Sequence, residues 1–177
     1  MLQRSDWWIV GLAVLVAAAG GYVQRGGQRP AKADSAIIGK SLPALTLNDL
    51  DGLPHQLSDY RGQRVLLNFW ASWCGPCLAE MPALQRAQEK FRERGAIVVG
   101  ISMDSTDRVR AFLAEHPVNY PILLGDMHSP STTHILGDTS EMLPYSVLIG
   151  ADGRILDSHV GILSSRQLEQ WLGGASP

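Results

Sequence analysis

The chain of 177 residues has little cysteine, few aromatic residues and no excess of charge. Its 15 Lys and Arg balance 17 Asp and Glu to a net charge of −2, and no basic cluster could meet the phosphates of a nucleic acid. Two cysteines are too few for a secreted disulfide scaffold, or for a structural zinc site without several well-spaced histidines. With 45% apolar residues the chain is nevertheless too hydrophobic to be disordered. The length suits one domain with an appendage.

The longest uncharged stretch lies near the N-terminus, at residues 7–23. It is just long enough to cross a bilayer, and aromatic residues stand at both ends, as at membrane interfaces. We expect a transmembrane or signal anchor at 1–24. A cleaved signal peptide is the alternative, because Ala17-Ala18-Ala19 offers a cleavage site.

The appendage continues as a polar segment rich in Gly, Pro and Ala, which predicts a flexible tether at 25–37 before a domain at 38–177. One basic residue precedes the apolar stretch and three follow it, a pattern that alone would leave the domain in the cytoplasm. Long domains, however, translocate largely regardless of nearby charge. The flanking charges therefore conflict with the extracytoplasmic location that we favour below.

The domain alternates between strand and helix patterns. We expect an N-terminal hairpin that turns at Asp51-Gly52, strands at 64–70, 96–102, 120–124, 145–150 and 154–161, and helices at 75–94, from Asp104-Ser105 to His116, at 131–136 and from Ser164 to Gly173. Pro54 would confine the second hairpin strand to a sheet edge. This order predicts an α/β sandwich with a mixed central sheet flanked by helices.

The two cysteines form the segment Cys74-Gly75-Pro76-Cys77 between a predicted buried strand and a helix. A helix N-terminus lowers the pKa of a thiol, so Cys74 is the candidate nucleophile. Cys77, one helical turn further and more buried, would be the resolving thiol. Gly75 would let a partner backbone approach, and Pro76 suits the first turn of a helix. Half a zinc site or a merely structural pair are the alternatives.

The segment 68–82, NFWASWCGPCLAEMP, resembles the active-site signature of the thioredoxin superfamily, and more narrowly that of the membrane-anchored TlpA/ResA/CcmG group of thiol–disulfide oxidoreductases. Pro82 stands where thioredoxins kink the active-site helix, and Leu143-Pro144 before a strand matches their cis-proline loop. The resemblance implies a thioredoxin-like fold over residues 43–172, with a central insertion at about 103–136.

The resemblance also implies roles for single residues. Glu80 would accept the proton of the resolving thiol if it is partly desolvated, whereas an exposed Glu80 would have no role. Pro144 would be cis and would present the Leu143 backbone to a substrate strand, unless it is an ordinary loop proline. Trp73 is either a substrate contact or a core residue. We expect Asn68 to be a hydrogen-bonded strand residue, and we assign no role to His159.

The function that the resemblance implies is a tethered reductase of disulfides in exported proteins, such as apocytochrome c. Its catalytic domain would lie in the periplasm or otherwise outside the cytoplasmic membrane, and a membrane electron donor of the DsbD/CcdA type would recharge it. We expect no cofactor beyond the Cys74–Cys77 disulfide, and no metal.

Two other functions are possible. A disulfide oxidase or isomerase of the same fold is the nearer alternative. A copper-delivery module is the more distant one, since it would need three residues between the cysteines where this chain has two. A peroxiredoxin is disfavoured because Ala71 stands where that class places Thr.

Overall fold

The computed structural model describes residues 35–128 and 130–174. The predicted anchor at 1–24 and residues 25–34 of the predicted tether lie outside this range. The last three residues of that tether form the 3-10 helix η1 (Ser35–Ile37), and Ile37 packs against the core. None of the described helices is long and apolar enough to cross a membrane.

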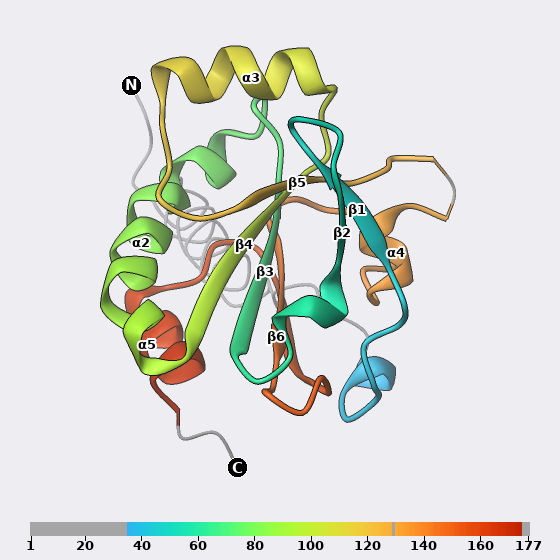
Figure 1. Ribbon diagram of the computed structural model, residues 1–177, viewed down its shortest axis with the longest axis vertical. Coiled ribbons are helices and arrows are strands. Elements are labelled where there is room, and N and C mark those ends of the chain that lie inside the picture. The colour runs from blue at the N-terminus through green and yellow to red at the C-terminus, as the bar shows by residue number, and fades with distance from the viewer. Residues whose placement is uncertain (1–34, 129, 175–177) are drawn as a thin grey trace, which may run out of the picture. The chain divides into compact units, whose positions relative to one another are not determined.

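The described residues form a seven-stranded sheet at the centre of the domain (Figure 1), and its strands lie in the order β2-β1-β5-β4-β3-β6-β7. The strands are β1 (Thr46–Asp49), β2 (Pro54–Gln56), β3 (Arg64–Trp70), β4 (Ala96–Ser102), β5 (Ile122–Leu124), β6 (Tyr145–Ile149) and β7 (Ile155–Val160). The helices are α2 (Gly75–Phe91), α3 (Thr106–Glu115), α4 (Thr132–Ile135) and α5 (Ser165–Gly173), and two further 3-10 helices are η2 (Leu57–Tyr60) and η3 (Arg92–Arg94).

The sheet is mixed, as predicted. Strands β3, β4 and β5 are parallel, while β1, β2, β6 and β7 pair antiparallel with their neighbours. All seven residues of β3 are buried, because this strand lies inside the sheet and both of its faces are covered. The loop after β3 and helix α2 therefore begin at the carboxyl end of a fully buried strand.

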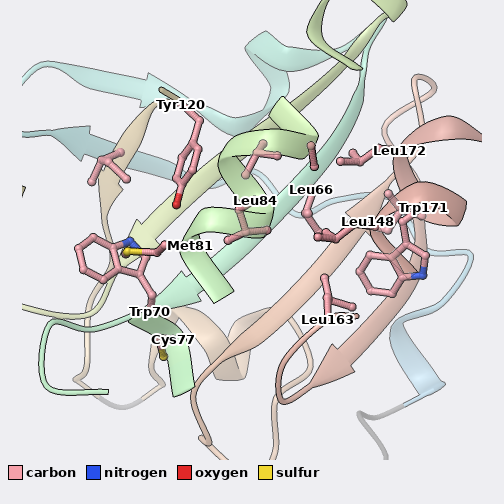
Figure 2. Close-up of a cluster of buried hydrophobic side chains, with 14 of the residues drawn as sticks. Leu66, Trp70, Cys77, Met81, Leu84, Tyr120, Leu148, Leu163, Trp171 and Leu172 are labelled. Atoms are coloured by element: carbon pink, nitrogen blue, oxygen red, sulfur yellow. The ribbon is translucent and has the colours of Figure 1, made fainter. Parts of the chain in front are cut away.

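Side chains of β3 alternate between two hydrophobic cores. Leu66 and Trp70 face the core that α2, α3 and α5 cover, which Figure 2 shows with its Leu, Met and Trp side chains. Val65, Leu67 and Phe69 face the other core, which residues from η1, η2 and the segment after α4 help to close. Asn68 belongs to the first set by its position, so its side chain points toward α2.

The N-terminal hairpin forms at the predicted place. The Asp49 carboxylate accepts hydrogen bonds from the main-chain N–H groups of Asp51 and Leu53, and Gly52 takes a positive φ of 80° in the turn. Strand β2, which begins with Pro54, is the edge of the sheet, as the proline predicted.

Several element boundaries differ from the sequence prediction. Strand β5 begins at Ile122 rather than at residue 120. The predicted helix at 75–94 is α2 followed by the tighter turn η3, and Gly95, with φ 77°, ends it. The predicted cap of α3 differs more. Ser105 is the N-cap but makes no side-chain cap bond, and the carboxylate of Asp104 is directed elsewhere.

The predicted central insertion, residues 103–136, contains α3, β5 and α4. Strand β5 lies between β4 and β1, and it therefore joins the N-terminal hairpin to the central strands.

Candidate active site

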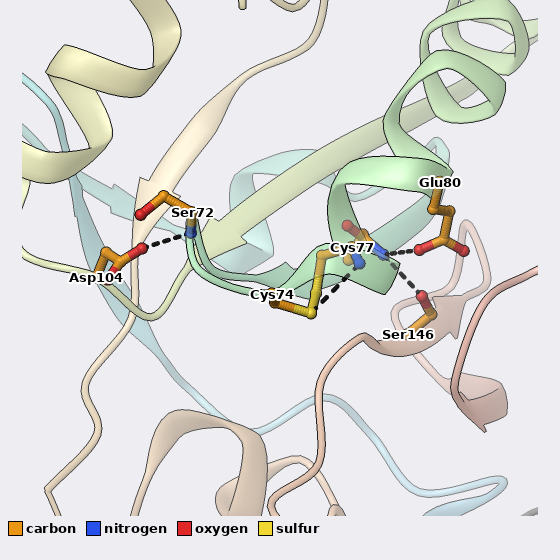
Figure 3. Close-up of a disulfide and its surroundings, with 7 residues drawn as sticks. Ser72, Cys74, Cys77, Glu80, Asp104 and Ser146 are labelled. Carbon is orange, nitrogen blue, oxygen red and sulfur yellow. Dashed lines mark hydrogen bonds between the residues drawn. A yellow bond between two sulfur atoms is a disulfide. The ribbon is translucent and has the colours of Figure 1, made fainter.

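Cys74 and Cys77 form a disulfide at the N-terminus of α2 (Figure 3). Cys74 is the N-cap residue of the helix, and the Cys77 N–H points at the Cys74 sulfur with a distance of 3.3 Å between nitrogen and sulfur. Sulfur at this position lies near unpaired N–H groups and the positive end of the helix dipole, which stabilise a thiolate. The local geometry thus matches the sequence prediction for a reactive thiol.

Burial separates the two sulfur-bearing residues only slightly. Cys74 is 5% exposed and Cys77 is 1% exposed, so the predicted order is right although both are buried. Gly75 and Pro76 between them are exposed, and a Cβ built on Gly75 would meet no atom within 4 Å. This open surface leaves room for a partner backbone beside the disulfide.

Glu80 lies one turn beyond Cys77, with its side chain in the interior. The residue is 1% exposed, so the alternative of a solvated helix residue is wrong. Its Oε1 accepts a hydrogen bond from the Leu163 N–H at 2.6 Å, and its Oε2 accepts one from Asn68 Nδ2 at 3.1 Å. Burial raises the pKa of Glu80 from an ordinary 4.5 to about 7, while these two hydrogen bonds oppose the change.

Asn68 joins this carboxylate to a second strand. Its Nδ2 donates to Ser146 Oγ at 3.1 Å as well as to Glu80, and Figure 3 shows Glu80 and Ser146 beside Cys77. Asn68 is therefore the hydrogen-bonded strand residue that we expected. Ser146 and Leu163 had no signal in the sequence, because only the fold brings residues so distant in the chain to one carboxylate.

The Leu143–Pro144 peptide bond is cis, as the resemblance implied. The pairing of Phe69 with Tyr145 places Pro144 at the end of β6 that adjoins the carboxyl end of β3. This is the end of the sheet from which the chain runs into Cys74. Pro144 is buried and its carbonyl accepts a hydrogen bond from Gly161 N–H at 2.7 Å, while Leu143 is half-buried.

Comparison with known proteins identifies the family. The model of the AhpC/TSA family matches residues 38–158. The chain belongs to the AhpC/TSA family. It is 33% identical to the thiol-disulfide oxidoreductase ResA of Bacillus thuringiensis (strain Al Hakam) over 141 residues, and this alignment covers 79% of each chain. It is also 33% identical over 138 residues to the thioredoxin-like protein YneN of Bacillus subtilis (strain 168), covering 76% of this chain and 78% of that one.

A solved structure agrees with this result. A solved structure from Chlorobium tepidum, described as a thiol:disulfide interchange protein DsbE, superposes on this structure with a TM-score of 0.70. The two chains are 32% identical, and the match covers 79% of this chain and 98% of that one. The fold is thioredoxin-like, and the protein is a thiol–disulfide oxidoreductase.

Three exposed apolar side chains belong to the segments that form the active-site end of the oxidoreductase. Trp73 is 62% exposed, so its alternative role as a core residue is wrong. Met142 and Ile162 are also exposed, and they stand next to Leu143 and to the Glu80-binding Leu163 in the chain. Each of these side chains therefore offers apolar surface in or next to the turn before Cys74, the cis-proline loop or the segment that binds Glu80.

Two further features of the oxidoreductase were not anticipated. Trp70 Nε1 and Tyr120 Oη are buried and have no hydrogen-bond partner among the described residues, and Figure 2 shows both side chains near α2. Burial raises the pKa of Tyr120, and the charge of Glu80 adds to this effect. The other feature is the carboxylate of Asp104, which binds the Ser72 N–H in the turn before Cys74.

No group of three or more His, Cys, Asp and Glu side chains within residues 35–128 and 130–174 is arranged to hold a metal ion. His159 is half-buried on β7, where it pairs with Ser146 in the sheet register. No hydrogen bond to its side chain gives it a part in the Glu80 network as the structure describes it.

Proposed function

We propose that this oxidoreductase reduces disulfides of exported proteins, with Cys74 as the attacking thiol and Cys77 as the resolving thiol. The observation that carries the proposal is Glu80. A buried carboxylate with a pKa of about 7 stands one turn from the more buried cysteine, and at neutral pH it can take up or release a proton. A proton acceptor at this place serves the step in which Cys77 must lose its proton.

The proposed reaction has two exchange steps. In the reduced protein the Cys74 thiolate attacks one sulfur of the substrate disulfide, which forms a mixed disulfide and releases the other substrate sulfur as a thiolate. Glu80 then takes the proton of Cys77, whose thiolate attacks the Cys74 sulfur. The mixed disulfide breaks, the second substrate sulfur leaves as a thiolate, and the Cys74–Cys77 disulfide forms. Two electrons pass to the substrate, whose thiolates take up protons from water.

The assignment of the two cysteines rests on their places in α2. The Cys74 sulfur accepts the Cys77 N–H at the helix N-terminus, an arrangement that favours negative charge on Cys74. Cys77 is the less exposed of the two and lies nearer to Glu80 in the chain. We assign substrate contact to Trp73, Gly75 and Pro76, all of which are exposed beside the disulfide.

We assign the substrate backbone to the cis-proline loop. A substrate segment in extended conformation would lie along Leu143 and Pro144, which end the loop just before β6. This loop and the Trp73 turn stand at the same end of the sheet, so one extended segment could contact both.

The remaining parts of the proposal concern the cell. The uncharged segment 7–23 would anchor the protein in the cytoplasmic membrane, with the catalytic domain in the periplasm or otherwise outside the membrane. A membrane electron donor of the DsbD/CcdA type would return the disulfide to the dithiol, and apocytochrome c is a candidate substrate. A fusion of alkaline phosphatase after Pro177 tests the location, because that enzyme is active only after export.

The deciding measurement is the reduction potential of the Cys74–Cys77 pair at equilibrium with glutathione. We expect a value well below the poise of an oxidising compartment. A value near about −120 mV, as for the strong oxidant DsbA, would instead establish an oxidase.

Trapping tests the assignment of the cysteines. Cys77→Ser should accumulate mixed disulfides with substrate proteins through Cys74, and Cys74→Ser is the matched control that should accumulate none. If the control variant traps substrates equally well, the roles of the two thiols are not those proposed.

A further inference from the structure

The carboxylate of Asp104 lies under the turn that leads into Cys74. Its Oδ2 accepts a hydrogen bond from the Ser72 N–H at 2.6 Å (Figure 3). The Asp104 side chain is only 3% exposed. A charged acceptor makes a hydrogen bond stronger than a neutral one does. The contact joins the loop after β4 to the active-site turn after β3.

This contact takes the place of a missing step in the sheet. The last paired residues of β3 and β4 are Trp70 and Ser102, and the Met103 N–H still donates to the Trp70 carbonyl at 2.9 Å. If the parallel ladder continued, the Ser72 N–H would donate to the Met103 carbonyl. The Asp104 side chain accepts that hydrogen bond instead, so the turn is held after the strands have separated.

The turn has few other constraints. The Cys74 N–H donates to the Ala71 carbonyl at 3.1 Å, which closes a tight turn with Ser72 and Trp73 in its middle. Trp73 is 62% exposed, so packing does not fix it. The hydrogen bond from Ser72 to Asp104 is therefore the main contact that orients the middle of this turn against the body of the domain.

The same carboxylate brings a charge close to the nucleophile. Cys74 is two positions after Ser72, a span of at most about 7 Å, so the carboxylate lies within about 10 Å of the Cys74 main-chain nitrogen. Arg108 forms a salt bridge with Asp104, with 3.9 Å from its Nη1 to Oδ1, and the Arg108 side chain is 71% exposed. Solvent weakens that pair, so much of the negative charge remains uncompensated.

We propose that Asp104 is a positioning residue of the active site, which fixes the turn carrying Trp73 and Cys74 and places a negative charge that disfavours the Cys74 thiolate. A less stable thiolate makes the dithiol a stronger reductant, because the reduced form then gains less from ionisation. This consequence rests on the proposed role of Cys74 as the attacking thiol. The turn-holding role does not depend on it.

Two substitutions separate the hydrogen bond from the charge. Asp104→Asn keeps an oxygen that can accept the Ser72 N–H but removes the charge, and Asp104→Ala removes both. Asp107→Asn is the matched control, because Asp107 is an exposed carboxylate on the adjacent helix α3. All variants are made in the full chain, with and without Cys77→Ser, which leaves Cys74 as the single thiol.

The first readout is the alkylation rate of Cys74 by iodoacetamide at pH 7 in the Cys77→Ser background. A unit charge at about 10 Å, with an effective dielectric constant of about 20, changes a thiol–thiolate equilibrium by about tenfold. A thiolate of lower basicity is also less nucleophilic, so we expect Asp104→Asn to react about threefold faster. Asp107→Asn should react as the parent does. Equal rates in all variants would overturn the charge effect.

The second readout is the exchange of the Ser72 amide proton with solvent. Asp104→Asn should keep this proton protected, whereas Asp104→Ala should speed its exchange at least tenfold relative to the amides of β3. Unchanged protection in Asp104→Ala would overturn the positioning role.

Global stability and substrate trapping complete the test. A loss of stability in Asp104→Ala without a change at Ser72 or Cys74 would mark Asp104 as merely structural, which also contradicts the proposal. Failure of the proposed reductase function appears separately, in the trapping and potential measurements on the parent protein.

Discussion

The ionisation of Glu80 should make the stability of the oxidised protein depend on pH, and Glu80→Gln should remove that dependence. The carboxyl group is 1% exposed, and burial raises its pKa to about 7. In the unfolded chain the same group returns to its ordinary value of 4.5. Between these two pH values the folded protein therefore binds more protons than the unfolded chain.

The sign and size of the effect follow from this difference. Stability falls as pH rises wherever the folded state holds more protons, so the contribution of Glu80 is fully present below pH 4.5 and is lost as pH rises through about 7. Each tenfold change in proton affinity corresponds to ~1.4 kcal/mol. The change from 4.5 to about 7 thus removes about 3 kcal/mol of unfolding free energy.

Urea unfolding between pH 4 and 8 measures this loss, with the disulfide intact so that neither cysteine titrates. The quantity of interest is the unfolding free energy of the wild type minus that of Glu80→Gln, in which contributions from the five histidines cancel. We expect this difference to fall by about 3 kcal/mol across the range. Glu89→Gln, at an exposed position on the same helix, controls for the loss of a glutamate from α2.

Two outcomes would refute the reasoning. Parallel curves for the wild type and Glu80→Gln would mean that folding does not change the proton affinity of Glu80. A difference that rises with pH would mean that the hydrogen bonds from Asn68 and Leu163 outweigh burial. Either result would also weaken the case for Glu80 as the proton acceptor of the resolving thiol.

Three further substitutions test other contacts. Trp73→Ala should change the unfolding free energy by less than ~0.5 kcal/mol, because Trp73 is 62% exposed. The same substitution should raise the KM for a disulfide-bearing protein several-fold, and an unchanged KM would contradict the role of Trp73 in substrate contact. Gly100→Ala should lower the unfolding free energy by about 1–3 kcal/mol in urea titrations, because the new Cβ would lie 2.7 Å from Ile122 Cδ1. A neutral effect would show that the Ile122 side chain moves easily. Arg64→Leu should lower the unfolding free energy by about 1–3 kcal/mol in the same titrations, because Arg64 Nη1 donates a hydrogen bond to the Trp171 carbonyl at 2.9 Å. A neutral result would mean that this carbonyl finds another donor.

Local patterns in the sequence were sufficient to predict the reactive centre and the elements around it. The apolar run at β3, the Cys74-Gly75-Pro76-Cys77 segment and the amphipathic helix after it are contiguous, so the geometry of the disulfide follows from a short stretch of chain. The Asp51-Gly52 turn and the Ser164 capping box are equally local, and both form where expected. The physical reason is that turns, caps and hydrophobic periodicity depend on near neighbours.

The partners of the site could not be predicted in the same way. Glu80 was a candidate by resemblance, but its donors Asn68 on β3 and Leu163 in the loop before α5 are distant in the chain, and only tertiary structure makes it buried. Asp104 shows the opposite problem. Its position before α3 suggested a helix cap. The Asp104 carboxylate instead accepts a hydrogen bond from the Ser72 N–H, which is distant in the chain, because a tertiary partner can replace a local one.

The edges of the sheet affect how the protein meets other chains. Strand β2 is only three residues long, and its first residue, Pro54, has no N–H to offer. At the other edge, β7 carries the exposed charge of Asp157. Short, proline-bearing and charged edges resist the strand-to-strand association that leads to aggregation. A visiting polypeptide would thus gain little from either edge, which is consistent with the proposed docking of substrate along Leu143 and Pro144 instead.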